Sequence, residues 1–266
     1  MTAVVAHRGN SSVAPQNTLA AFESAWRAGA DMIELDLRLT RDGEVVVIHD
    51  ATVDATTDGS GRVTVLDRRA VRSLDAGTSF ASAYAGQRVP TFAEVVAFLA
   101  DRPGLRLLVE LKGEWTPSEV RLVAGPLAVA GLTSRVVAQS FSRATVAALR
   151  DAAPAVRRGL LLADVPADLG SACASLGVHA CNPHGILLAQ QPRLLDDLHA
   201  AGIQVMVWTL DEPDEWAWAV EQGVDAIITD RPDRLVGWLA GRGHAPLGRE
   251  RRGSDVAAGV RLHAHA

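Results

Sequence analysis

Residues 32–50 of this 266-residue chain read MIELDLRLTRDGEVVVIHD. Two runs of strand-forming residues, 32–37 and 45–48, lie on either side of the sequence Thr40-Arg41-Asp42-Gly43. Asp-Gly is a favoured dipeptide in tight hairpin turns. The second run is therefore expected to return antiparallel to the first, as the other arm of a hairpin.

The hairpin places three chemically useful side chains near one another. Glu34 and Asp36 stand two residues apart in a predicted strand, so their side chains point to the same face. A turn at 41–43 should bring His49 back to about the level of Asp36. The stretch thus predicts two carboxylates and an imidazole at one end of a sheet.

Outside this stretch, short β-branched runs alternate with Ala- and Leu-rich segments of helical period, which favours a parallel sheet. The apolar runs are 3–6, 32–37, 45–48, 105–111, 136–139, 159–162, 178–181, 205–209 and 226–229. The helix candidates are 18–28, 92–100, 117–130, 142–150, 191–201, 212–221 and 231–239. Setting 45–48 aside as the hairpin arm leaves eight parallel strands. The fold class is therefore predicted as α/β, a (β/α)8 TIM barrel, which typically takes about 250 residues.

Two regions depart from the alternation of strand and helix segments. Residues 51–89 carry glycine-rich turn sequences and a short helical stretch near 68–74, which indicates a small insertion over the C-terminal face of the barrel. Residues 241–266 lack a core pattern and are expected to form a disordered tail. We therefore expect one barrel domain over residues 1–240.

The composition excludes several classes of protein. The net charge of −5 gives no global field that would attract nucleic acid or an anionic membrane. No apolar run is long enough to cross a bilayer, and the N-terminus does not resemble a signal peptide. Only Cys173 and Cys181 are present, so they are expected to be buried thiols rather than a disulfide framework. We expect a cytoplasmic protein that binds a small molecule; the sequence leaves its oligomeric state open.

Strand ends supply the candidate ligands of a metal ion. Glu34, Asp36 and Glu110 come at the ends of predicted strands, where barrel active sites lie. Three carboxylates together repel one another and need a cation or a proton to coexist. Oxygen ligands favour Mg²⁺, Ca²⁺ or Mn²⁺ over zinc. The alternative is a network of ion pairs in which Glu110 meets Lys112 or Arg8.

The other side chains of this group suit phosphodiester cleavage. Arg8 offers a planar fork to two phosphate oxygens, and Lys112 offers a point charge. His7 and His49 are candidates for general acid and base, because imidazoles titrate near neutral pH. The sequence does not assign one role to each histidine.

Two aromatic residues are weaker candidates for substrate binding. Trp208 lies at the end of a predicted strand and Phe141 follows another, and both could form an apolar wall against a glycerol-sized group, although a place in the core suits Trp208 equally well. Several polar residues nearby have ordinary structural explanations. Asp230, Asn17 and Thr18 are expected to cap helices, and 182–184 is expected to form a turn.

The ordered set of motifs resembles the glycerophosphodiester phosphodiesterase family, from about residue 4 to about residue 239. The motifs are His7-Arg8-Gly9, Pro15-Gln16-Asn17-Thr18, Glu34-Leu35-Asp36, Thr40-Arg41-Asp42-Gly43, His49-Asp50, Glu110-Leu111-Lys112 and Thr229-Asp230-Arg231-Pro232. The resemblance implies a barrel with an insertion, and a Mg²⁺- or Ca²⁺-dependent hydrolase. Such an enzyme releases an alcohol and glycerol 3-phosphate from deacylated phospholipids such as glycerophosphocholine.

The resemblance also implies roles that agree with the chemistry above. The residues matching Glu34, Asp36 and Glu110 hold the metal, the two histidines act as acid and base, and Arg8 and Lys112 hold the phosphate. One position departs from the family pattern, because Gln16 stands where the family usually has glutamate. Two other functions stay open: a phospholipase D-like enzyme of the sphingomyelinase D type, and a non-catalytic barrel that binds phosphoesters.

Overall fold

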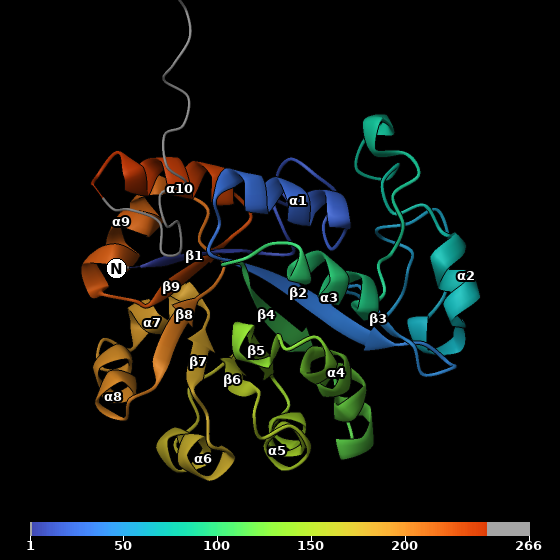
Figure 1. Ribbon diagram of the computed structural model, residues 1–266. Coiled ribbons are helices and arrows are strands. Elements are labelled where there is room, and N and C mark those ends of the chain that lie inside the picture. Colours follow the sequence, from blue (N-terminus) through green and yellow to red (C-terminus); the bar gives the residue numbers. More distant parts are fainter. Residues whose placement is uncertain (1, 244–266) are drawn as a thin grey trace, which may run out of the picture.

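The computed structural model describes residues 2–243, and eight parallel strands in it close into a barrel (Figure 1). Each strand pairs with the next in the order β1-β2-β4-β5-β6-β7-β8-β9, and β9 pairs with β1. The strands are β1 (Ala3–Ala6), β2 (Met32–Leu39), β4 (Arg106–Leu111), β5 (Val136–Ser140), β6 (Arg157–Leu162), β7 (Ala180–Pro183), β8 (Gln204–Val207) and β9 (Ala226–Thr229). The predicted TIM barrel is confirmed.

Helices surround the strands on the outside of the barrel (Figure 1). They are α1 (Leu19–Ala28), α3 (Phe92–Ala100), α4 (Pro117–Val129), α5 (Arg143–Ala152), α6 (Leu169–Leu176), α7 (Gly185–Gln190), α8 (Leu194–Ala200), α9 (Pro213–Gln222) and α10 (Pro232–Ala240), whereas α2 (Arg68–Ser73) belongs to the insertion. Local sequence fixes their ends. Thr18 caps α1, as predicted, by accepting a hydrogen bond from the backbone N–H of Ala21, and Gly29 ends that helix in the left-handed conformation.

The hairpin is confirmed in direction and in register. Strand β3 (Val45–Val47) pairs antiparallel to β2, with Val47 opposite Leu37. The backbone N–H of Ile48 donates to the carbonyl of Asp36 at 2.9 Å. His49 therefore follows directly at the level of Asp36, as the turn predicted.

The barrel buries apolar side chains in two layers. Outward-facing residues of the strands pack against the helices in one large cluster, which includes Ile33, Leu35 and Leu37. A second cluster fills the barrel interior and draws on most of the strands. Its members are Ala3, Val5, Met32, Leu108, Val137, Ala180, Met206, Ala226 and Ile228. The interior is thus a packed apolar plug, above which the same strands continue toward their C-terminal ends.

The insertion lies at one side of the barrel, beyond α1 and α3 (Figure 1, cyan to green). It contains α2, as predicted, and it packs over β3 around its own apolar cluster of Val46, Ile48, Val53, Val63, Val71, Ala76 and Val89. Its outer part reaches back to the barrel loops, where the hydroxyl of Tyr84 donates to the carbonyl of Val13 at 2.7 Å. The insertion therefore borders the C-terminal face from the β1–α1 side.

Several sequence predictions are corrected here. Residues 182–184 are not a turn: Asn182 and Pro183 end β7, and His184 caps α7. Pro183 is tolerated because a strand end does not need its missing N–H. The predicted helix at 191–201 begins only at Leu194. Helices α6 and α7 were missed, because α6 is rich in small residues and α7 is very short.

Two further expectations concern burial and membranes. Cys173 and Cys181 are buried free thiols, as expected. Within the described part of the chain, no helix is long and apolar enough to span a membrane. The predicted tail at 241–266 lies outside the described residues from position 244 onward.

Candidate active site

The C-terminal ends of the strands carry polar side chains directly above the apolar plug. Because alternate strand residues share a face, the residue two positions after the last plug residue of a strand points toward the C-terminal mouth of the barrel. His7 follows Val5 in this way, and Glu110 follows Leu108. A cavity of about 270 Å³ opens there. Its lining includes the predicted residues His7, Arg8, Glu34, His49, Glu110, Lys112, Phe141 and Trp208, together with Gln139, Leu161 and Ile228.

The loop after β1 is shaped by a close approach to α1. A Cβ on Gly9 would lie 2.7 Å from the backbone of Ala21, and the φ of Gly9 is +88°. Only glycine fits both constraints. Arg8 itself has a φ of 55°, which is uncommon for a residue with a side chain. In this conformation the backbone N–H of Arg8 donates to Oε2 of Glu34 at 3.1 Å.

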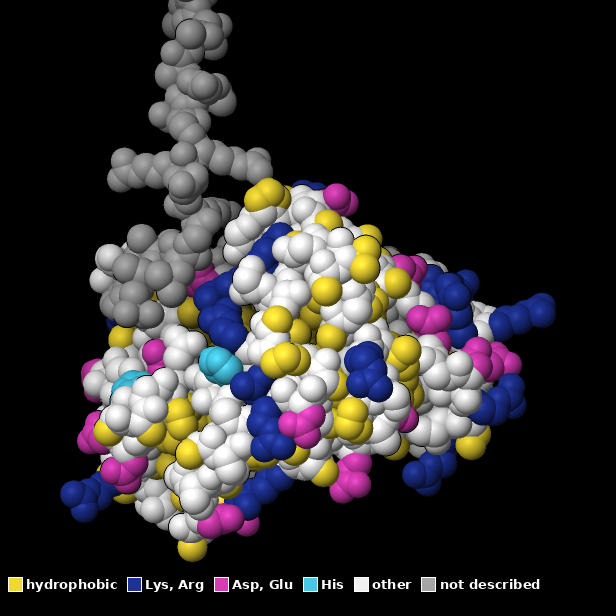
Figure 2. Space-filling model, turned by 60° about the horizontal axis from the view of Figure 1, so that its bottom comes forward, with side chains coloured by type: hydrophobic (Ala, Val, Ile, Leu, Met, Phe, Trp, Pro, Cys, Tyr) yellow, Lys and Arg dark blue, Asp and Glu magenta, His cyan; other side chains and the backbone are white. Residues whose placement is uncertain are grey.

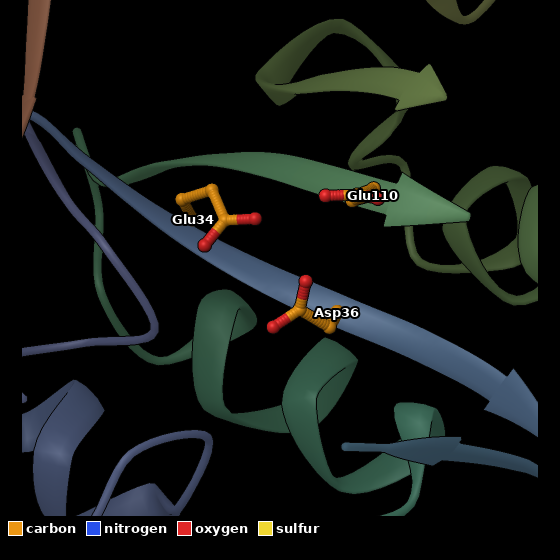
Figure 3. Close-up of side chains that lie close together, drawn as sticks. All are labelled: Glu34, Asp36 and Glu110. Atoms are coloured by element: carbon orange, nitrogen blue, oxygen red, sulfur yellow. The ribbon is translucent and has the colours of Figure 1, made fainter. Parts of the chain in front are cut away.

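Three carboxylates point toward one another above the plug (Figure 3). Glu34 and Asp36 come from β2, and Glu110 of β4 lies directly opposite Asp36 in the strand register. One oxygen from each of the three lies within 4.8 Å of the others, and all three residues are buried. The predicted cluster of acidic ligands therefore exists as a compact group.

The electrostatics of these carboxylates fit a divalent cation. Burial, together with the charges of Asp36 and Glu110, raises the pKa of Glu34 well above its ordinary value. Burial likewise raises the pKa of Glu110. No Lys or Arg side chain of the described residues forms an ion pair with Glu34. Hard oxygen ligands in this number and spacing can hold a cation of the Mg²⁺ or Ca²⁺ type, which would relieve the unpaired charge.

Two cationic side chains contact Asp36. Nζ of Lys112 lies 3.0 Å from Oδ1 of Asp36 and 2.8 Å from Oε2 of Glu110. Nε of Arg8 lies 3.3 Å from Oδ2 of Asp36. Burial alone would raise the pKa of Asp36, but Lys112 and Arg8 hold it below its ordinary value. Of the ion pairs considered as the alternative to a metal site, the one between Glu110 and Lys112 thus forms, whereas Arg8 pairs with Asp36 and not with Glu110. Among the described residues, none of these ion pairs includes Glu34.

Each histidine is held by an aspartate. Nδ1 of His7 lies 2.7 Å from Oδ1 of Asp230, and Nδ1 of His49 lies 2.7 Å from Oδ1 of Asp50. A carboxylate accepts hydrogen bonds, so Nδ1 carries the proton in both rings and Nε2 is left to exchange protons. Burial lowers the pKa of His49, against the attraction of Asp36.

The two predicted aromatic residues meet at the rim of the mouth. The rings of Phe141 and Trp208 pack edge to face with centroids 5.8 Å apart. The indole N–H of Trp208 donates to the carbonyl of Asn182 at 2.8 Å, which fixes the ring. Phe141 is 43% exposed, so one side of this pair remains open to the cavity.

The comparisons with known proteins agree with this geometry. Residues 7–234 match the glycerophosphoryl diester phosphodiesterase family. This chain belongs to that family. It is 34% identical to a glycerophosphodiester phosphodiesterase of Caldanaerobacter subterraneus subsp. tengcongensis, over 88% of this chain and 96% of the relative. It is 29% identical to a Bacillus altitudinis protein of the same name, over 89% and 97% of the two chains.

A solved structure supports the same family. The crystal structure of a glycerophosphodiester phosphodiesterase from Agrobacterium tumefaciens superposes with a TM-score of 0.78 at 32% identity. The match covers 88% of this chain and 99% of that one. As a member of this family, the protein is a phosphoric diester hydrolase.

The sequence-based prediction that Asp230 and Asn17 cap helices is wrong. Asp230 does not cap α10; its carboxylate accepts from His7 and from the hydroxyl of Ser11 at 2.8 Å. Burial opposes the charge of Asp230, but the hydrogen bonds from His7 and Ser11 keep its pKa below the ordinary value. Asn17 does not cap α1 either, and its amide donates to Oδ2 of Asp36 at 2.8 Å. The alternation Ile228-x-Asp230 was the signal that could have placed Asp230 in the mouth.

Gln16, the position that departs from the family pattern, contacts the phosphate-binding candidate. Its Oε1 accepts from Nη1 of Arg8 at 2.6 Å. A neutral amide at this place fixes the guanidinium without neutralising it. Arg8 therefore has one charged partner, the carboxylate of Asp36, and a neutral partner in Gln16.

Proposed function

We propose that this protein hydrolyses glycerophosphodiesters to glycerol 3-phosphate and an alcohol. A divalent cation, Mg²⁺ or Ca²⁺, is held in this proposal by Glu34, Asp36 and Glu110. His7 and His49 exchange the protons of the reaction. The substrates are expected to be deacylated phospholipids, as the names of the relatives suggest.

One observation carries the proposal: two aspartate-held histidines, two cationic side chains and two buried carboxylates, those of Glu34 and Glu110, line a single cavity, and the third carboxylate of the cluster lies buried beside them. A phosphodiester needs all three kinds of group. Its non-bridging oxygens need fixed positive charge, which grows more important as charge builds toward the transition state. Its attacking and leaving oxygens need proton transfer.

Different residues are assigned to phosphate binding, proton transfer and the exclusion of water. Arg8 and Lys112 bind the non-bridging oxygens of the phosphoryl group and orient it over the carboxylates. Nε2 of one histidine takes a proton from the attacking oxygen, which belongs to water or to a hydroxyl of the substrate's glycerol, and Nε2 of the other gives a proton to the leaving oxygen. Attack by the glycerol hydroxyl gives a cyclic phosphate, which water then opens to glycerol 3-phosphate. Trp208 and Phe141 exclude water from the glycerol side. A bound divalent cation would polarise a phosphoryl oxygen and an adjacent hydroxyl.

The test is the release of glycerol 3-phosphate from glycerophosphocholine in the presence of Mg²⁺ or Ca²⁺, and its loss on chelation. His7→Ala or His49→Ala should lower kcat by roughly 10²–10⁴-fold, the range expected for a positioned acid or base. His199→Ala is a matched control, because His199 of α8 forms a similar pair, at 2.9 Å, with Asp225, which precedes β9. It should leave kcat unchanged.

Three results would count against the proposal. Metal-loaded protein that releases glycerol 3-phosphate from no member of a panel of glycerophosphodiesters would reject the substrate class. A clear preference for lysophosphatidylcholine over glycerophosphocholine would instead support the phospholipase D-like alternative. Full activity in the presence of chelator would reject the role given to the three carboxylates.

A further inference from the structure

A second cavity, of about 320 Å³, opens on the other side of His7 and Arg8. His7 and Arg8 line both cavities and form the wall between them. The second cavity contains none of the three clustered carboxylates. Its other walls come from the loops after β1, β8 and β9 and from the insertion, and include Ser11, Ser12, Phe80, Asp211, Asp230 and Arg231.

We infer that this second cavity binds the alcohol part of the substrate and selects an uncharged polyhydroxyl group, such as glycerol, over a quaternary ammonium group. The inference rests on the proposed function. The two ester oxygens of a phosphodiester leave phosphorus in different directions, because the four oxygens are arranged tetrahedrally. Since Arg8 lines both cavities, a phosphoryl group bound at Arg8 can project the glycerol into one cavity and the alcohol into the other.

The volume suits such a group. A glycerol unit occupies roughly the space of four waters of the bulk liquid, about 120 Å³. The second cavity, at about 320 Å³, takes it with room for bridging water. The first cavity, of about 270 Å³, is left for glycerol phosphate between the carboxylates and the aromatic pair.

The hydrogen-bonding groups of the second cavity match hydroxyls. Oδ1 of Asp211 accepts from Thr229 and from the backbone N–H of Asp230, both at 2.8 Å. Its Oδ2 accepts no hydrogen bond from the described residues. Arg231 donates through Nη1 to Glu212 at 2.7 Å, and its Nη2 makes no hydrogen bond within the described part of the chain. The second cavity therefore offers one free acceptor and one free donor. A hydroxyl group can pair with both, because it donates one hydrogen bond and accepts others.

The charges of the cavity disfavour a quaternary ammonium group. Two carboxylates, Asp211 and Asp230, are balanced by two guanidinium groups, Arg8 and Arg231. A quaternary ammonium has no N–H to donate, and its recognition relies on several aromatic faces around the cation. Phe80 is the only aromatic ring in the lining other than the imidazole of His7.

Phe80 is a residue of the insertion that lines the second cavity and can contact the alcohol part of the substrate. Its ring packs edge to face on Tyr84 with centroids 5.6 Å apart, and Tyr84 is tied to the barrel through the carbonyl of Val13. Phe80 is 43% exposed, so part of its ring surface is free to cover the C–H groups of a polyol. Figure 2 shows one face of the molecule, on which histidine side chains lie among Lys, Arg, acidic and hydrophobic ones.

The experiment compares kcat/KM for glycerophosphoglycerol and glycerophosphocholine. The wild-type protein should prefer glycerophosphoglycerol by about tenfold or more, the discrimination expected when a hydrogen-bonding site meets a group that cannot pair. Asp211→Asn keeps the Oδ1 acceptor but replaces the free oxygen by an amide donor. It should reduce this preference by about tenfold. Phe80→Ala should lower kcat/KM for glycerophosphoglycerol more than for glycerophosphocholine.

Two controls separate this inference from the proposed function. Phe141→Ala alters the first cavity, so it should slow both substrates alike and leave their ratio unchanged. Glycerol 3-phosphate lacks the alcohol part of the substrate, so in this inference it occupies the first cavity. Its inhibition of the enzyme should therefore be unaffected by Phe80→Ala. A wild-type preference for glycerophosphocholine, or a ratio that neither Asp211→Asn nor Phe80→Ala changes, overturns the inference. Failure to hydrolyse any diester would instead overturn the proposed function.

Discussion

The interior plug and the mouth of this barrel are built from the same faces of the same strands. On β4, Leu108 belongs to the plug and Glu110 to the mouth, only about 7 Å further along the strand. Leu108 is fully buried among apolar side chains, whereas Glu110 is buried among charges. The difference shows that one step of two residues separates the part of the strand that stabilises the fold from the part that carries chemistry.

The two regions have opposite effects on stability. Burying the plug removes apolar surface from water and stabilises the fold. Burying Glu34 and Glu110 raises their pKa values, which means that their charged forms are less stable in the folded protein than in water. A region that costs stability in this way is expected at a functional site rather than in a structural core.

The largest effect expected from this comparison is on activity. Glu110→Gln keeps the size of the side chain but removes one charge from the three clustered carboxylates. Metal-dependent kcat should fall on the order of 10²–10³-fold, as when one preorganised electrostatic group is removed. The melting temperature without metal should be unchanged or higher, because a buried charge is lost. Steady-state kinetics and calorimetry of the same variant measure both.

Lys112 makes this test stricter. Its ammonium contacts both Glu110 and Asp36, so Glu110→Gln leaves it with one partner. If the carboxylates served only as a structural ion-pair network, the variant would lose stability and keep its activity. That result would remove the distinction between plug and mouth.

The second prediction concerns the plug. Leu108→Ala should lower the free energy of unfolding by about 2–5 kcal/mol, the range for truncating a buried leucine. The activity of the folded fraction should change far less than in Glu110→Gln. Chemical denaturation and kinetics at a temperature where the variant is folded provide the measurements. A large fall in kcat with little loss of stability would show that the plug takes part in the chemistry.

Much of this arrangement could be predicted from the sequence because it depends on local rules. The alternation of strand residues placed Glu34 beside Asp36, and the Asp-Gly turn set the register that brings His49 to their level. Parallel strands end at the same face, which brought Glu110 to the same mouth. Each of these steps needs only period, turn chemistry and strand direction.

The rest could not be predicted because it depends on contacts between distant segments. Asp230 and Asn17 each have a local alternative as helix caps, and only the packed barrel shows that they contact His7 and Asp36 instead. The side chain of Phe80 comes from an insertion without periodic pattern, so its approach to the second cavity could not be read from spacing.

The smallest effect is expected in the insertion, outside both plug and mouth. The carboxylate of Asp75 accepts from the backbone N–H groups of Gly77 and Thr78, both at 2.8 Å, and of Gly86 at 2.6 Å. These hydrogen bonds hold the pKa of Asp75 far below its ordinary value. A folded-state pKa below the unfolded one contributes stability above the unfolded value, near pH 4, and loses it as pH falls toward the folded value.

Asp75→Ala should therefore speed amide hydrogen exchange at Gly86 at neutral pH, while the melting of the barrel hardly shifts. Asp54→Ala is the matched control: it removes a single acceptor from Gly61 elsewhere in the insertion, at 2.9 Å, and should leave Gly86 protected. In the wild type, acid should produce the same local loss at Gly86. If Asp75→Ala instead lowered the melting temperature of the whole protein, the insertion would unfold together with the barrel. A region that opens independently of the barrel would show faster exchange only at its own amides.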